Sequence, residues 1–153
     1  MSPSKQKTID QPVELTGKGL FSGQTCRLRF VPAGADAGVT FIRTDLPGPA
    51  RIAADIAHVG KRARRTSLVN GEAAVETVEH VLSAVSGMGI DNVDIEISAP
   101  ETPSFDGSAA PFTDALAKAG VRELDADQRI VVIDEPVTVS QDDCTLADRK
   151  STR

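Results

Sequence analysis

The segment from Thr77 to Pro100 changes its hydrophobic period once, and this change constrains the fold more than any other part of the chain. Its first half, VEHVLSAVSGM, carries apolar residues at helical spacing, and its second half, DNVDIEIS, alternates apolar with mostly polar residues as a half-buried strand does. The helical stripe consists of Val78, Val81, Leu82, Val85 and Met88. Gly87 and Gly89 are expected to end the helix. A helix followed directly by a strand indicates mixed α and β structure.

The ends of two helices are marked by residues that suit those positions. Thr77 is expected to cap the first helix through its hydroxyl. A second helix is predicted after FDGS, with Ser108 as its cap, Pro111 in its first turn and Gly120 at its end. Its inner face is expected to comprise Phe112, Ala115, Leu116 and Ala119.

Strands are predicted on both sides of this helical region. Thr25–Val31 and Gly38–Asp45 alternate polar and apolar residues, and Ala50–Val59 is expected to be a strand with a bend. Gly-containing loops between these short runs indicate an antiparallel meander. RIVVI, PVTVS and the start of the tail DCTLADRKSTR also have strand character. The predicted fold is therefore an α+β domain, a mostly antiparallel sheet with two helices on one face.

Length and charge restrict the class of protein. The 153 residues are sufficient for one domain with a core, and a net charge of −5 argues against general nucleic-acid binding. The N-terminus lacks the apolar stretch of a signal peptide, and no apolar run approaches the ~20 residues that span a bilayer. Cys26 and Cys144 are too few for a disulfide framework. A cytoplasmic protein with reduced thiols is expected.

Glu79 and His80 are candidates for chemistry because they lie in the first turn of the first predicted helix. The partial positive charge of a helix N-terminus favours an ionised carboxylate and a neutral imidazole. These are the forms that act as a base and as a metal ligand. The two residues point about 100° apart on a helix, so both can border one cleft. From this pair alone, a solvent-exposed Glu beside a surface His is the commoner interpretation.

Two loops offer further candidates, each with a simpler alternative. In PSFDGSAAP, Asp106 and Ser108 could receive an anion or a sugar hydroxyl, although a capped helix start with an Asx turn is commoner. GKRARRTS could meet a phosphate, although such loops are more often simply solvated. Its cations are Lys61, Arg62, Arg64 and Arg65.

Two other features are expected to be structural. TGKGLFSG lacks the terminal Lys-Ser/Thr and the preceding buried strand of a P-loop, so a tight turn between strands is predicted. His58 has no acidic or cysteine partner at metal-ligand spacing in the sequence and is expected to play a structural role.

Several segments together resemble the first half of the UDP-3-O-acyl-N-acetylglucosamine deacetylase family of lipid A biosynthesis. The matching segments are TGKGLFSG, FIRTDLPGPARIAADIAHV, RTSLVN, TVEHVLSAVSGMGIDNVDIEISAPETPSFDGSAAPF and LAKAGVREL. They occur in the order and with the spacing of the family from about Thr8 to about Ala147. The block from Thr77 to Phe112 is long and idiosyncratic, and it outweighs the simpler interpretation of the Glu-His pair.

The resemblance implies a fold, an activity and two site residues. The family has two similar β-α-α-β domains, each a sheet packed on two helices, with the active site between them. The resemblance implies that His80 ligates Zn²⁺ and that Glu79 serves as general base. The implied reaction is metal-assisted hydrolysis of the acetamide of UDP-3-O-acyl-N-acetylglucosamine. Leu20 and Asp106 are candidate substrate-binding residues.

The sequence also departs from the family pattern. The other zinc ligands, the second catalytic His and a substrate-binding Lys belong to a second domain that has no counterpart here. Residues 1–147 are therefore expected to be the N-terminal domain, and 148–153 an off-pattern polar tail of a truncated chain. Phe21 also stands where the family often has His.

These departures set the expected function of the chain. It is expected to be inactive alone and to need a separate C-terminal domain, or to self-associate through its uncovered cleft face. The alternative is a non-catalytic binding or regulatory module on the same scaffold. Nucleic-acid binding through the basic loop has the least support.

Overall fold

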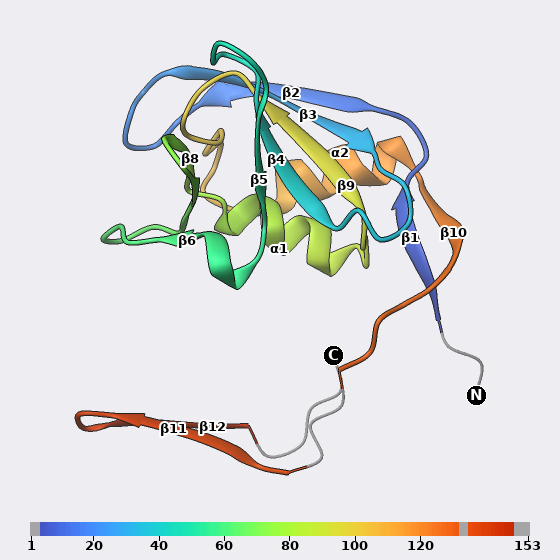
Figure 1. The fold of residues 1–153 in the computed structure, drawn as a ribbon. Coiled ribbons are helices and arrows are strands. Elements are labelled where there is room, and N and C mark those ends of the chain that lie inside the picture. The colour runs from blue at the N-terminus through green and yellow to red at the C-terminus, as the bar shows by residue number, and fades with distance from the viewer. Residues whose placement is uncertain (1–3, 132–134, 149–153) are drawn as a thin grey trace.

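A curved five-stranded sheet forms the centre of the protein (Figure 1). The computed structural model describes residues 4–131 and 135–148. The strand order is β2-β3-β9-β4-β5, and every neighbouring pair is antiparallel except β4 and β9, which are parallel. The strands are β2 (Val13–Lys18), β3 (Thr25–Pro32), β9 (Val93–Ile97), β4 (Val39–Arg43) and β5 (Ala50–Ala53).

The predicted strands at 25–31 and 38–45 are confirmed as β3 and β4, but the predicted meander is wrong. β9 lies between these strands, pairing Phe30 with Ile95 on one side and Phe41 with Ile95 on the other. A parallel β4–β9 pair needs a long crossover connection, and the segment from β5 to α1 provides it. Buried side chains at positions 93, 95 and 97 fit this central place in the sheet.

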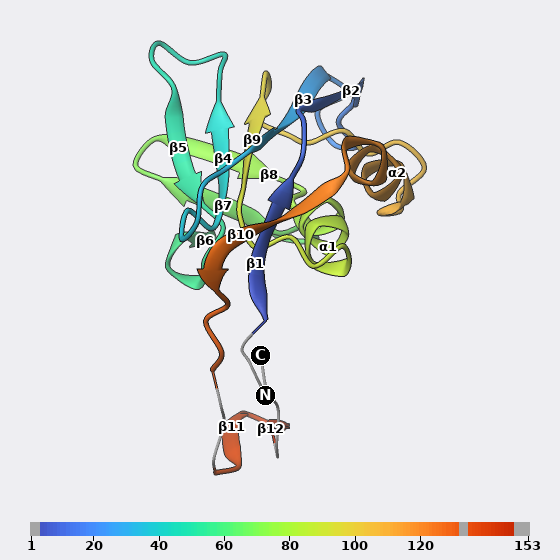
Figure 2. The ribbon, with the colours of Figure 1, turned by 90° about the vertical axis from the view of Figure 1, so that its right-hand side faces the viewer.

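Two helices, α1 (Glu79–Gly87) and α2 (Ala110–Ala119), pack side by side on one face of this sheet (Figure 2). The predicted stripe of α1 faces the core: Val78, Val81 and Val85 are buried, and Leu82 and Met88 pack against the core. The four residues predicted for the inner face of α2 are all buried. The predicted α+β class and the helix ends at Gly87 and Gly120 are confirmed.

A small three-stranded sheet precedes α1 and forms one side of the domain (Figure 1). Its strands are β6 (Val59–Gly60), β7 (Ser67–Asn70) and β8 (Ala73–Glu76). The segment predicted as one bent strand is divided into β5, a 3-10 turn η1 (Ile56–His58) and β6. The turn forms because the Asp55 carboxylate accepts hydrogen bonds from the amides of Ala57 and His58, at 2.9 and 3.2 Å.

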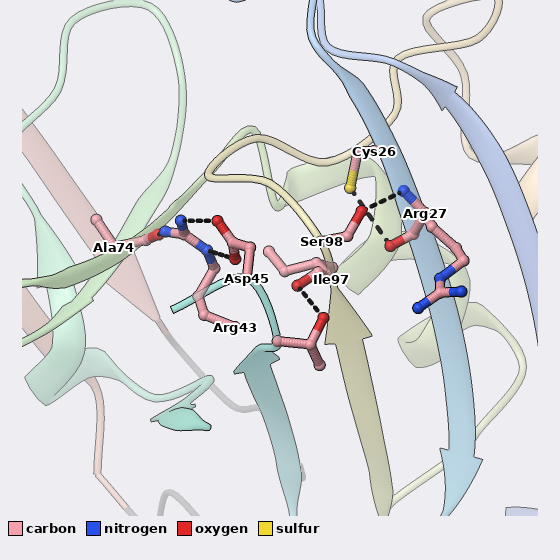
Figure 3. Close-up of polar contacts among 8 residues, drawn as sticks. Cys26, Arg27, Arg43, Asp45, Ala74, Ile97 and Ser98 are labelled. Atoms are coloured by element: carbon pink, nitrogen blue, oxygen red, sulfur yellow. Dashed lines mark hydrogen bonds and ion pairs between the residues drawn. The ribbon is translucent and has the colours of Figure 1, made fainter. Parts of the chain in front are cut away.

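A buried arginine joins the central sheet to the small sheet (Figure 3). Arg43 at the end of β4 binds both carboxylate oxygens of Asp45, at 2.8 and 2.7 Å, and donates to the carbonyl oxygen of Ala74 in β8 at 2.6 Å. The Arg43 guanidinium lowers the pKa of the Asp45 carboxyl below its ordinary range. This bond network fixes the strand that leads to α1.

Cys26 lies in β3 beside this network, where burial raises the pKa of its thiol (Figure 3). Cys26 and the exposed Cys144 are both free. A buried thiol with a raised pKa is a poor nucleophile. We therefore assign Cys26 to the core.

The N-terminal strand β1 (Lys5–Ile9) pairs with β10 (Val121–Asp127), which follows α2. β11 (Val137–Gln141) and β12 (Cys144–Asp148) form a hairpin apart from the domain (Figures 1 and 2). This hairpin confirms the strand character of PVTVS and of the start of the tail. The predicted strand RIVVI is wrong at residues 129–131, which are irregular, and Val132 and Ile133 lie outside the described residues. Within the described part of the chain, no helix is long and apolar enough to cross a membrane.

Candidate active site at the junction of β8 and α1

The connection between β8 and α1 is a sharp turn centred on Thr77, which has a positive φ of 59°. The predicted cap is wrong: α1 begins at Glu79 after Val78, and no side chain caps it. A capping residue normally has an extended backbone, whereas the backbone of Thr77 is in the left-handed region. Its hydroxyl instead donates to Glu101 Oε1 at 3.1 Å.

Glu79 and His80 lie in the first turn of α1, as predicted, and both are half-buried. Glu79 Oε2 accepts a hydrogen bond of 3.1 Å from the backbone N–H of Thr66, in the loop between β6 and β7. The Thr66 carbonyl in turn accepts from the amides of Thr77 and Val78, at 2.9 and 3.4 Å. Thr66 therefore binds the turn through its carbonyl oxygen and Glu79 through its N–H, and this N–H orients the Glu79 carboxylate.

Asp106 lies in the loop between β9 and α2, within electrostatic reach of His80. Its carboxylate accepts from the Ser108 amide at 3.0 Å and from the Ser108 hydroxyl at 2.8 Å. The Ser108 hydroxyl makes the largest contribution to lowering the pKa of Asp106, and the Ser108 amide adds to it. These bonds form the Asx turn that the sequence offered as the commoner interpretation.

Ser108 Oγ accepts from the Ala110 amide at 3.1 Å, although the residue before the helix is Ala109 and not Ser108 as predicted. Phe105 packs edge to face on Phe112 of α2, with ring centroids 5.3 Å apart. The loop that carries Asp106 is therefore anchored to the second helix.

The turn between β2 and β3 lies on the same side of the domain as β8 (Figure 1). Leu20 and Phe21 belong to this turn. Leu20 is 65% exposed. The Phe21 ring lies beneath the guanidinium of Arg65, 4.3 Å from its centroid. The tight turn predicted for TGKGLFSG is confirmed, with Gly23 at a φ of 63°. The aromatic ring that replaces the expected His is thus paired with a cation from the basic loop.

The basic loop, residues 60–67, is partly bound to the rest of the domain rather than fully solvated. Arg62 and Arg65 each form an ion pair of 2.9 Å with Glu76 at the end of β8. Lys61 and Arg64 are exposed, and Arg64 has a positive φ of 63°. Half of its four cations therefore hold the loop against the strand that leads to Glu79.

The expectation that His58 lacks an acidic partner is wrong. Its Nδ1 lies 2.6 Å from Asp55 Oδ1, and the hydrogen bond to His58 is the main cause of a lowered pKa at Asp55. The contact follows from the 3-10 turn, which brings residues three apart together. The structural role predicted for His58 agrees with this local pairing.

Glu101 is the residue of this region that the sequence interpretation missed. It is 2% exposed and accepts hydrogen bonds from the amides of Phe21 and Ser22, at 2.9 and 2.7 Å. One sequence feature could have indicated it. Glu101 lies between two prolines in the segment APETP, shortly after the apolar strand residues that end at Ile97. A charged side chain at the end of a buried strand is rarely buried without partners.

The described residues contain no group of three or more His, Cys, Asp or Glu side chains that could hold a metal ion. A catalytic zinc site takes three protein ligands. His80 offers one imidazole, and the neighbouring Glu79 carboxylate is bound to Thr66. These residues alone do not fit a catalytic zinc ion.

Comparisons with known proteins agree with the resemblance in the sequence. The family described as UDP-3-O-acyl N-acetylglycosamine deacetylase (LpxC) matches residues 6–150. The chain is similar to UDP-3-O-acyl-N-acetylglucosamine deacetylase of Anaeromyxobacter dehalogenans, with 46% identity over 143 residues, covering 94% of this chain and 46% of the relative. The protein of the same name from Pseudomonas entomophila is 44% identical over 139 residues, covering 91% of this chain and 46% of the relative. The chain thus spans about half the length of these curated relatives.

Proposed function

Because the chain belongs to the UDP-3-O-acyl N-acetylglycosamine deacetylase family, we propose that it supplies one part of the active site of such an enzyme. The substrate is UDP-3-O-acyl-N-acetylglucosamine, the molecule in the names of its relatives. The reaction is hydrolysis of the acetamide, which releases acetate and leaves a free amine on the sugar. The observation that carries this proposal is the position of Glu79, held by the Thr66 N–H beside His80.

Glu79 is the proposed general base. A base must be ionised and must lie within hydrogen-bond reach of the proton that it removes. The helix N-terminus favours the carboxylate form, and the Thr66 amide occupies only Oε2, so Oε1 can accept a proton from water. As water attacks the acetamide carbon, a C–O bond forms and the C–N bond then breaks. The nitrogen gains the proton that Glu79 removed from water and leaves as an amine.

His80 is the proposed ligand to a zinc ion. His80 is half-buried, a neutral imidazole is a common metal ligand, and Asp106 lies within electrostatic reach of it. When bound, zinc supplies Lewis-acid chemistry for amide hydrolysis. We propose that the remaining ligands come from outside the described residues. The relatives are about twice as long as this chain and therefore have room for them.

We further propose that this chain alone has negligible turnover and binds zinc weakly. Residues 1–147 would then act as one of two domains of a cytoplasmic enzyme. A non-catalytic binding module is the second candidate function. It is favoured by Phe21, which stacks on Arg65 where the family often has His.

A chimera distinguishes these two functions. The chain would replace the matching 139 residues of the Pseudomonas entomophila relative. Acetate release from UDP-3-O-acyl-N-acetylglucosamine is expected from the chimera and not from the 153-residue chain. A folded chimera without activity would favour the non-catalytic module, and a fast zinc-dependent rate from the chain alone would contradict the incomplete site.

A further inference from the structure

The buried carboxylate of Glu101 links two loops that are far apart in the sequence. Oε1 accepts from the Phe21 amide at 2.9 Å and from the Thr77 hydroxyl at 3.1 Å, while Oε2 accepts from the Ser22 amide at 2.7 Å. These three donors and the Ser22 hydroxyl are neutral, so hydrogen bonds from uncharged groups compensate the buried charge. Burial by itself raises the pKa of Glu101, but these bonds and the Ser22 hydroxyl outweigh it and lower the pKa.

The turn from Gly19 to Gly23 is shaped around this carboxylate. A Cβ atom on Gly19 would clash with Glu101 Oε2 and Ser22 Oγ where they now lie, so glycine allows the carboxylate to lie this close to the turn. The Gly19 amide donates to the Gln24 carbonyl at 2.9 Å, and the Gly23 amide donates to the Gly19 carbonyl at 3.1 Å. The turn is closed on itself and presents two successive amides to Glu101.

The backbone on either side of Glu101 is fixed to the residues that precede α1. The Glu76 amide donates to the Pro100 carbonyl at 2.8 Å, and the Thr102 amide donates to the Glu76 carbonyl at 3.2 Å. The Thr102 hydroxyl donates to the Thr77 carbonyl at 2.6 Å. Any shift of Glu101 is therefore transmitted to the turn that leads to Glu79.

A second connection runs through the aromatic ring that the turn carries. Glu101 holds the backbone of Phe21, whose ring lies 4.3 Å below the Arg65 guanidinium. The next residue, Thr66, donates its amide to Glu79 Oε2. Both connections from Glu101 thus end at the proposed base, one through Thr77 and one through Arg65.

We propose that Glu101 is a positioning residue that acts through the Gly19–Gly23 turn and Thr77 to hold the Thr66 amide against Glu79. The inference rests on the proposed function of Glu79 for its catalytic meaning. Its structural content can be tested without any activity. Glu101 itself reaches no reacting atom in this account.

The test uses amide signals of the 153-residue chain in solution NMR. In Glu101→Gln, one donor-facing oxygen becomes an NH₂ group that cannot accept from an amide. Hydrogen exchange at Phe21 and Ser22 is expected to rise roughly tenfold or more, because a local opening becomes easier. The Thr66 amide signal is expected to shift, because its hydrogen bond to Glu79 Oε2 changes.

Two further variants make the test decisive. Glu96→Gln, on the solvent-facing side of β9, is the matched control and is expected to leave the Thr66 signal in place. Thr77→Val removes one donor with little change in shape and keeps the test usable if Glu101→Gln fails to fold. An unchanged Thr66 signal in a folded Glu101→Gln or Thr77→Val chain would overturn the proposal. An inactive chimera would count against the proposed function and leave this readout intact.

Discussion

The backbone N–H of Thr66 donates a 3.1 Å hydrogen bond to Glu79 Oε2, across thirteen residues of sequence. This contact joins the basic loop to the first turn of α1. It orients a carboxylate that would otherwise rotate freely on a half-exposed helix start. The proposed base is thus held by main chain, and the residues around it act by fixing that main chain.

We predict that His80, and not His58, determines zinc content. In the chimera, His80→Ala is expected to lose bound zinc because it removes a ligand, whereas His58→Ala is expected to retain it because His58 pairs with Asp55. Zinc per protein, measured after dialysis by atomic emission, checks this. Equal zinc contents in the two variants would contradict the assignment of His80.

We predict that Phe21→Ala lowers the free energy of unfolding by about 0.5–1 kcal/mol, the usual contribution of an exposed cation–π pair. Leu20→Ala is the matched control, since the Leu20 side chain is 65% exposed. Urea unfolding of the two variants checks the difference. If Leu20→Ala destabilises the chain as much as Phe21→Ala, the pairing with Arg65 carries no measurable energy.

We predict that Asp45→Asn lowers the free energy of unfolding at pH 7 by about 2 kcal/mol, because hydrogen bonds between charged groups contribute ~1.5–3 kcal/mol. The change leaves the buried Arg43 guanidinium without its anion. Asp94→Asn removes the more exposed pair with Arg51 and should cost less. Equal losses in the two variants, measured by urea unfolding, would contradict this.

We predict that the chain loses stability in acid over a defined window. The pKa values of Asp45 and Glu101 in the folded chain lie below their ordinary ones. Both carboxylates therefore contribute fully to the free energy of unfolding above about pH 4, the ordinary pKa of these groups in the unfolded chain. The contributions are lost as the pH falls through the lower folded values. Thermal melting between pH 6 and pH 2 is expected to show a smaller decrease for Glu101→Gln than for the unaltered chain. Parallel decreases would show that Glu101 does not titrate as inferred.

We predict that the chain self-associates through the β11–β12 hairpin, a surface other than the cleft face expected from the sequence. Val137, Val139 and Leu146 are exposed, and Val139 pairs directly with Leu146, so one face of the hairpin is apolar. Val139→Lys is expected to shift sedimentation toward the monomer, and Thr138→Lys on the other face serves as its control. Monomeric sedimentation of the unaltered chain at high concentration would contradict this prediction.

Much of the domain could be predicted because its helices and its central strand have strong periodicity. The stripe of α1, the alternation of β9 and the inner face of α2 all match the structure. β1 buries the polar side chains of Gln6 and Thr8, and β2 and β10 are partly or fully exposed, so none of the three shows a clear apolar alternation. The parallel β4–β9 pair could not be predicted, since strand order depends on contacts distant in sequence.

The site was predictable only in part for a related reason. Glu79 and His80 were found through the helix pattern and the family resemblance. Thr is a preferred cap before a helix, whereas the positive φ of Thr77 directs its hydroxyl to Glu101. The contacts of Glu101 span about eighty residues, so no local pattern reveals them.

The most direct test of the central claim is the rate of acetate release by the chimera with Glu79→Gln. The matched control is Glu72→Gln, which changes an exposed carboxylate on the turn between β7 and β8. The account predicts that kcat falls about 10²–10⁴-fold for Glu79→Gln, the usual contribution of a general base, and stays unchanged for Glu72→Gln. An active chimera whose kcat is the same with Glu79→Gln would contradict the assignment of Glu79 as the base.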